Sequence, residues 1–282
     1  MFFFLLQKSY KILNLLSIDV ALGACSMAYL ISSISEVNTP LITYFILGFT
    51  VWIIYTLDHL LDANDLKNNA IAPRHIFHYK YQKVLTILTI SITLIIITLS
   101  FLTLPFITIL YGVIGSFFVG CHIILVTVWG KKISFLVQKE LSIAISYTLG
   151  ISIPSISLIE GIIDTTILIF IFQCFLLAFI NLCIFSYFDH QIDKEESQTS
   201  IVRLLKEEKT SILIYILFII QLVISCISLF NNTNNSFQII LILMNLTLFI
   251  IFKKYKFFRK NERYRLLGDF IFIYPIILIF IN

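Results

Sequence analysis

Residues 41–62 read LITYFILGFTVWIIYTLDHLLD, an apolar run that ends in two aspartates, Asp58 and Asp62. The run is long enough to cross a bilayer, which takes about 20 apolar residues in a helix. Because side chains four residues apart lie on one face of a helix, the two carboxylates are expected to project together. The sequence therefore predicts a membrane helix that carries an acid pair at one end.

The same ending occurs a second time in the chain. A later apolar run, residues 164–188, is followed by DHQID, in which Asp189 and Asp193 repeat the spacing of the first pair. A single pair of this kind is typical of solvated acids at the membrane surface. Two pairs with matching spacing, depth and helix direction instead predict a metal site that is shared between the two helices.

The ligand type indicates which metal this is. Carboxylate oxygens suit Mg²⁺, which keeps several waters and bridges to substrate phosphates. Helical di-iron sites instead place Glu and His three residues apart, on one face. Here His59 and His190 directly follow an aspartate, about 100° around the helix. We therefore expect these two histidines at the rim of the site and not among its ligands.

Composition indicates a polytopic membrane protein. The 282 residues are 59% hydrophobic and 13% charged, and the mean hydropathy is +0.97. Globular domains carry about 25% charged residues. The prediction is an all-α bundle of nine transmembrane helices in one integral membrane domain, residues 1–282. The nine apolar runs are residues 12–33, 41–61, 83–104, 105–129, 137–159, 164–188, 211–230, 236–252 and 266–281.

Charge patterning predicts the orientation. With the N-terminus in the cytoplasm, all 20 Lys and Arg residues fall on the cytoplasmic side of the nine runs. The net charge of +4 is therefore a topology signal and does not indicate nucleic-acid binding. The N-terminal residues lack the pattern of a cleavable signal or an organelle leader, so we expect a bacterial inner membrane. The five cysteines all lie in apolar runs and are expected to be packing residues.

Several other polar residues are candidates for the site. Arg74 follows the first acid pair, and its planar fork suits a phosphate; His78 is expected on the same helical face as Arg74. Asp19, within the first run, is expected to face the bundle interior, either lining a cavity or making an interhelical hydrogen bond. Asp269 is a candidate partner for a nearby arginine. Tyr55 is a candidate aromatic wall residue, as is Trp52.

These features together resemble the UbiA-type intramembrane prenyltransferases. The resemblance rests on the nine runs, the two Asp-x-x-x-Asp endings, Lys132 after the fourth run, Gly150 and Pro154 in the fifth, and residues 264–269 before the last. It implies that Asp58, Asp62, Asp189 and Asp193 hold Mg²⁺ on the diphosphate of an isoprenoid, with Arg74, Lys132 and His78 as diphosphate contacts. It further implies transfer of the prenyl group to a lipid-soluble, often aromatic, acceptor near the cytoplasmic face.

The chain departs from the family pattern at three points, one of which is that the Arg-Pro common after the first motif is absent and Pro73-Arg74 is the nearest element. Ile54 stands where the family often has Asn, and Ser197 stands where a third acid often follows, with Glu196 next to it. Two alternatives to an enzyme therefore stay open: a non-catalytic relative that binds isoprenoid lipid, and a small-molecule transporter. Acids at the membrane edge, and not at its midplane, count against the transporter. The acceptor, the donor chain length and the oligomeric state are not encoded in these motifs.

Overall fold

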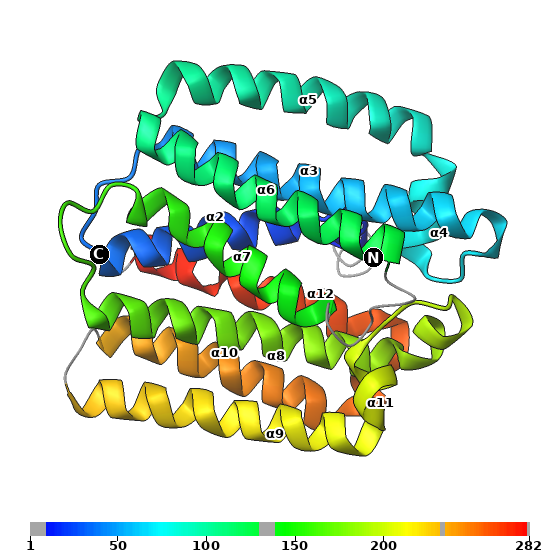
Figure 1. Ribbon diagram of the computed structural model, residues 1–282. Coiled ribbons are helices and arrows are strands. Elements are labelled where there is room, and N and C mark those ends of the chain that lie inside the picture. Colours follow the sequence, from blue (N-terminus) through cyan, green and yellow to red (C-terminus); the bar gives the residue numbers. More distant parts are fainter. Residues whose placement is uncertain (1–9, 130–138, 232–234, 281–282) are drawn as a thin grey trace.

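The computed structural model describes residues 10–129, 139–231 and 235–280, and this part of the chain is almost entirely helical (Figure 1). The α-helices are α2 (Ile18–Ile34), α3 (Leu41–Leu66), α4 (Pro73–Lys80), α5 (Gln82–Thr103), α6 (Phe106–Trp129), α7 (Lys139–Ile156), α8 (Thr165–Glu195), α9 (Ile201–Phe230), α10 (Asn235–Lys253), α11 (Tyr255–Arg259) and α12 (Arg263–Phe270). Three 3₁₀ segments complete the order: η1 (Lys67–Asn69), η2 (Lys260–Glu262) and η3 (Ile271–Phe280).

The protein is an integral membrane protein by the length and apolarity of its helices. Among the described residues, five helical stretches are long and apolar enough to cross a bilayer: Leu41–Asn69, Gln82–Thr103, Thr165–Glu195, Ile201–Phe230 and Asn235–Lys253. Described helical residues overlap all nine predicted apolar runs. The number of nine crossings nevertheless stays a prediction, because α2 has only 17 residues and the last run is largely 3₁₀ helix.

Two helix ends differ from the predicted ones, and both changes affect the acid pairs. Helix α3 continues to Leu66 and α8 continues to Glu195. Each aspartate pair therefore lies inside the last turns of its helix and does not terminate it. Helical spacing is thus kept through both pairs, which holds each pair on one face.

Helix α8 is the centre of the bundle. In its apolar stretch 61% of the residues are buried, against 17% in α5. Figure 1 shows α8 between α7 on one side and α9 and α10 on the other, with α5 at the periphery. A helix that is apolar on all sides is stable only when other helices surround it, so α8 carries its acid pair at one end of the most enclosed helix of the bundle.

One close packing contact fixes the C-terminal segment. Gly23 of α2 lies so near η3 that a Cβ built on it would be 2.8 Å from Cβ of Phe272. Small residues allow such close approach between membrane helices. The contact holds η3, and with it the preceding α12, against the wall formed by α2.

Replacing Gly23 by Ala should therefore lower the stability of the protein. The clash involves a Cβ atom that cannot rotate away, and overpacking of this kind costs about 1–3 kcal/mol. Gly120→Ala is the matched control, because a Cβ at Gly120 meets no atom within 4 Å. Thermal unfolding in nonionic detergent measures the effect. Equal unfolding midpoints for the two variants would contradict the packing described here.

Candidate functional site

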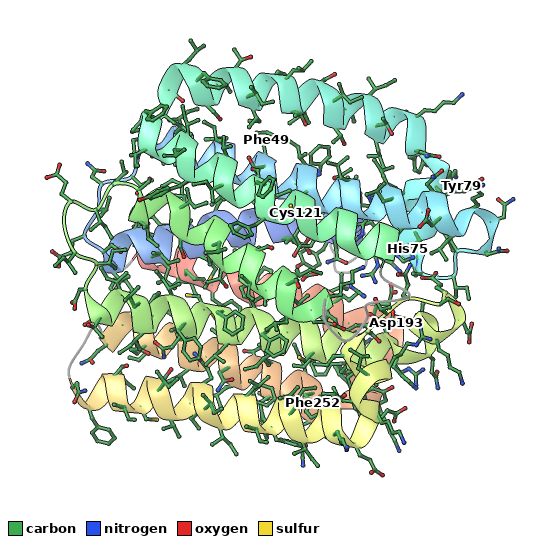
Figure 2. The ribbon with its side chains drawn as sticks, in the orientation of Figure 1. Phe49, His75, Tyr79, Cys121, Asp193 and Phe252 are labelled. Atoms are coloured by element: carbon green, nitrogen blue, oxygen red, sulfur yellow. The ribbon has the colours of Figure 1, made fainter. Side chains whose placement is uncertain are left out.

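A polar cavity of about 190 Å³ lies at the end of the bundle where α3 and α8 carry their acid pairs. All four predicted aspartates line it: Asp58, Asp62, Asp189 and Asp193. Figure 2 shows Asp193 and His75 at this same end, although they come from opposite halves of the chain. The fold therefore brings the two Asp-x-x-x-Asp pairs to one shared space, as the sequence pattern predicted.

Asp62 is held by two cationic or hydrogen-bonding neighbours. Its Oδ2 atom lies 3.5 Å from Nζ of Lys139, at the start of α7, and 3.7 Å from Nε2 of His75 in α4. These contacts orient the carboxylate in the cavity, and they come from two helices that follow α3 in the chain. Neither contact follows from the spacing of residues in the sequence.

His75 is itself fixed by Glu196, the residue that caps α8. Oε2 of Glu196 lies 2.8 Å from Nδ1 of His75, and Oε1 accepts hydrogen bonds from the backbone N–H groups of Ile71 and Ala72 at 2.7 and 2.8 Å. A chain of contacts therefore runs from Glu196 through His75 to Asp62. It joins the end of α8 to the loop that follows α3.

The hydrogen bonds at Glu196 favour its ionised form. Burial by itself raises the pKa of this carboxyl, but the hydrogen bonds from His75, Ala72 and Ile71 outweigh burial and lower the pKa to about 2. Glu196 is thus charged at every physiological pH. The sequence showed Glu196 only as a residue next to the missing third acid of the second motif.

Asp189 has a different environment from Asp62. It accepts hydrogen bonds from the hydroxyl of Tyr264 and from the guanidinium of Arg265, both in α12. The Arg265 guanidinium also lies 4.9 Å from the ring centroid of Phe185, within range of a cation–π interaction. Arg265 was predicted only as part of the basic stretch before the last helix, whereas the structure makes it the ion-pair partner of the second motif.

The three predicted diphosphate contacts differ in where they lie relative to the polar cavity. Arg74 lines the polar cavity, and its Nε atom is buried without a hydrogen-bond partner among the described residues. His78 is buried beside His59, with 5.0 Å between ring centroids, and its Nδ1 donates to the carbonyl of Arg74. Burial lowers the pKa of His78, so this histidine is neutral at pH 7. Lys132 falls outside the described residues.

The two motif histidines are not equivalent. His59 lines the polar cavity, as expected for a rim residue, and its buried Nδ1 has no hydrogen-bond partner among the described residues. His190 instead pairs with Glu207 of α9, with 2.8 Å between Nε2 and Oε1. The expectation of a rim position therefore holds for the first motif, whereas the second histidine braces α8 against α9.

Asp19 and Asp269 share one hydrogen-bond donor. Nδ2 of Asn14 lies 2.6 Å from Oδ2 of Asp19 and 3.0 Å from Oδ2 of Asp269. Asp19 also accepts a hydrogen bond from the hydroxyl of Tyr10 at 3.3 Å. Of the two expectations for Asp19, the structure shows the hydrogen bond between segments. Asp269 contacts Asn14, while the nearby Arg265 pairs with Asp189.

Charge balance in the polar cavity favours a bound cation. Of the described residues that line it, seven are carboxylic acids and three are permanent cations, Arg74, Lys139 and Arg265. The acids are Asp58, Asp62, Glu140, Asp189, Asp193, Glu262 and Asp269. Such an excess of acid repels an anionic ligand unless a cation neutralises it.

The donor set fits Mg²⁺ that is shared with a phosphate ligand. Among the described residues, no group of three or more Asp, Glu, His or Cys side chains is arranged so that it could hold a metal ion. A complete cage is not required, because Mg²⁺ is commonly held by one or two carboxylates together with waters and substrate phosphates. In such a site the aspartates that line the cavity would supply the carboxylates, and an incoming ligand would supply the remaining oxygens.

An apolar cavity of about 570 Å³ adjoins the polar one. It lies between α3, α5, α6 and α7, and it shares Tyr55, Asp58, Ile143 and Tyr147 with the polar cavity. Tyr55 is thus a wall residue as predicted, whereas Trp52 is not among the described lining residues. The shared residues form a junction at which a polar head and an apolar tail of one ligand would meet.

Comparison with known proteins supports this architecture. The sequence matches no family model and no curated protein. One similar structure is the apo form of a UbiA homolog from Aeropyrum pernix K1, with a TM-score of 0.68 and 13% identity over 93% of this chain and 98% of that one. The chain has a UbiA-type fold. A second similar structure has a title that reads "Structural and mechanistic insights into the biosynthesis of Digeranylgeranylglyceryl phosphate synthase in membranes". Its TM-score is 0.54, with 15% identity over 96% of this chain and 97% of that one.

Some residues of the site have no distinctive signal in the sequence. Lys139 and Arg265 stand in basic stretches that also serve topology, so their charge alone does not distinguish them from membrane-surface lysines and arginines. The signal that could have identified them is their place at the start of a helix: Lys139 begins α7, and Arg265 follows Tyr264 in the first turn of α12. Glu196 carried no signal, because its role depends on a loop that lies far from it in the sequence.

The Glu196 contacts predict a specific loss of stability in acid. The folded-state pKa, about 2, lies below the ordinary value of 4.5, so the stabilisation is complete above pH 4.5 and is lost as the pH falls toward 2. Glu196→Gln should therefore be less stable than the unaltered protein at pH 6. The gap between their thermal midpoints should close between pH 4.5 and pH 2.

Glu195→Gln is the control for this measurement, because Glu195 is exposed and adjacent. Its midpoint should follow that of the unaltered protein at every pH. A gap for Glu196→Gln that stays constant through the acid range would contradict an ionised Glu196 in the folded state.

Proposed function

We propose that this protein is a Mg²⁺-dependent prenyltransferase, which moves an isoprenoid group from a prenyl diphosphate to a lipid-soluble, often aromatic, acceptor. The observation that carries the proposal is the junction of an acid-rich polar cavity with an apolar cavity. A prenyl diphosphate has a polar head that binds metal and a hydrocarbon tail, so it matches both cavities at once. The UbiA-type fold of the two similar structures supports the same conclusion.

In this proposal the four aspartates, Asp58, Asp62, Asp189 and Asp193, hold Mg²⁺. When bound, Mg²⁺ supplies positive charge that stabilises the departing diphosphate. Arg74 grips diphosphate oxygens with its planar fork, and Lys132 and His78 are further candidate contacts. Lys139 and Arg265 face Asp62 and Asp189, and they keep the acid pairs neutralised before the metal and the donor arrive.

The reaction breaks the C–O bond between the prenyl carbon and the diphosphate, whose oxygen keeps the electron pair. A bond then forms between that carbon and the acceptor, which releases a proton. In this proposal Tyr55 and Tyr147, which line both cavities, stabilise the allylic cation through their aromatic rings. The apolar walls beyond them keep water away from the reacting carbon, so that the acceptor and not water captures it.

The polar cavity lies at the end of the bundle that carries the basic loops after α3 and α8. The distribution of Lys and Arg predicts that this end faces the cytoplasm. The charged diphosphate of a prenyl donor could reach the cavity there from water. We therefore place the reaction near the cytoplasmic face of the membrane, with a bacterial inner membrane as the expected location.

One observation favours a second candidate, a non-catalytic protein that binds isoprenoid lipid. Asp189 is already engaged by Tyr264 and Arg265, which leaves fewer free oxygen positions for a metal in the second motif. In that case isoprenoid lipid would copurify with the protein, and no diphosphate would be released from any donor.

Asp58→Asn and Asp189→Asn should each reduce prenyl transfer at least about hundredfold, because each removes negative charge that holds Mg²⁺ against the diphosphate. The measurement is consumption of labelled prenyl diphosphates by the protein in lipid nanodiscs with Mg²⁺, and then with Mg²⁺ removed by chelator. Lipid extract and a panel of aromatic compounds serve as acceptors.

Asp65→Asn is the matched control, because Asp65 is exposed on the same helix and lines neither cavity. It should retain full activity. Full activity in both Asp58→Asn and Asp189→Asn would refute the acid-pair mechanism. If the unaltered protein binds prenyl diphosphates but consumes none, the result would support the lipid-binding candidate. Counterflow of a solute in liposomes would support a transporter.

A further inference from the structure

The length of the apolar cavity limits what can occupy it. Along α3 its lining extends from Tyr55, at the junction, to Thr43, a rise of about 18 Å in a helix. Along α6 the lining extends from Val119 to Thr108, a rise of about 16 Å. Oγ of Ser157 lies 2.8 Å from Oγ1 of Thr108, which lines the far end. Two opposing walls thus give nearly the same depth.

The walls of the cavity are apolar in spite of their hydroxyl groups. Thr50, Thr93 and Ser100 each donate to the backbone carbonyl four residues earlier in the same helix, at 2.7 Å. Their hydrogen bonding is therefore satisfied within the helix. The rest of the lining is mostly apolar and accepts hydrocarbon, whereas the buried hydroxyl of Tyr147, at the junction, has no hydrogen-bond partner among the described residues.

Two glycines create space along this path. Gly112 of α6 and Gly150 of α7 both line the cavity, and a Cβ added to either one would meet no atom within 4 Å. Gly150 lies three residues beyond Tyr147, about 4.5 Å from the junction. A side chain at either position would occupy volume that is now open.

Contacts between α6 and α7 give the depth of Gly112. On one side of it, Thr108 bonds Ser157 at 2.8 Å; on the other, a Cβ on Gly115 would lie 3.1 Å from Cδ1 of Ile153. Gly112 therefore lies level with the stretch between Ile153 and Ser157. This stretch is about 9 to 15 Å beyond the junction, in the deeper half of the cavity.

We infer that the donor has about three to four isoprene units, because each unit adds four chain carbons that span about 5 Å at C–C bond lengths near 1.5 Å. The depth of the lining sets this limit, and Gly112 and Gly150 keep the path along it open. The inference rests on the proposed function, since it takes the occupant to be the tail of a prenyl diphosphate. Tails of eight or more units would have to leave the bundle.

Binding of inert donor analogues tests the limit without an acceptor. The probes are prenyl S-thiolodiphosphates of two, three, four and five units, with Mg²⁺ and the full chain in nanodiscs, and the readout is the dissociation constant. Affinity should rise with each unit to the third or fourth and should not rise beyond it. A continuous rise through five units would overturn the inference.

Gly112→Leu should weaken binding of the four-unit analogue at least about tenfold and change the two-unit analogue by less than about twofold. Gly112→Ala should give a smaller change in the same direction, which keeps the test valid if the leucine variant folds poorly. Gly150→Leu should weaken all four analogues, because it blocks the first unit.

Gly120→Leu is the control, because Gly120 is on the same helix, has open space around it and does not line the cavity. It should bind all analogues as the unaltered protein does. If Gly112→Leu behaves like Gly120→Leu, the length limit is overturned while the proposed transfer stands. If the unaltered protein binds no analogue of any length, the proposed function fails, and the inference fails with it.

Discussion

The site depends on one buried carboxylate, Glu196, which ties the two halves of the chain together. It accepts backbone hydrogen bonds from Ile71 and Ala72 and pairs with His75, which contacts Asp62. Buried charges are tolerated when they are fully hydrogen-bonded, and a break on one side is costly. This contact fixes the loop after α3 to the end of α8, and so it fixes the distance between the two acid pairs.

Negatively charged side chains are concentrated close to that contact. Four aspartates at two helix ends face each other where the helix dipoles already concentrate negative charge. Lys139 opposes one pair, and Arg265 opposes the other. These cations hold the carboxylates in place without satisfying the whole acid excess of the cavity.

Polar and apolar chemistry meet at a small number of residues. Tyr55 and Tyr147 line both the acid-rich cavity and the apolar cavity between α3, α5, α6 and α7. Aromatic rings with a polar tip are suited to such a boundary. The peripheral position of α5, whose apolar stretch is mostly exposed, leaves the apolar cavity next to the bilayer from which lipid-soluble molecules would come.

The sequence by itself determined the helical membrane class, the two acid pairs and their common end of the bundle. Hydrophobic length, helical spacing and Lys/Arg bias are local properties that each segment carries alone. Only the tertiary structure decided that Arg265 pairs with Asp189, that Glu196 reaches the loop after α3, and that His190 leaves the cavity while His59 stays. Those outcomes depend on which surfaces pack across long separations in the chain, and no spacing within one helix specifies them.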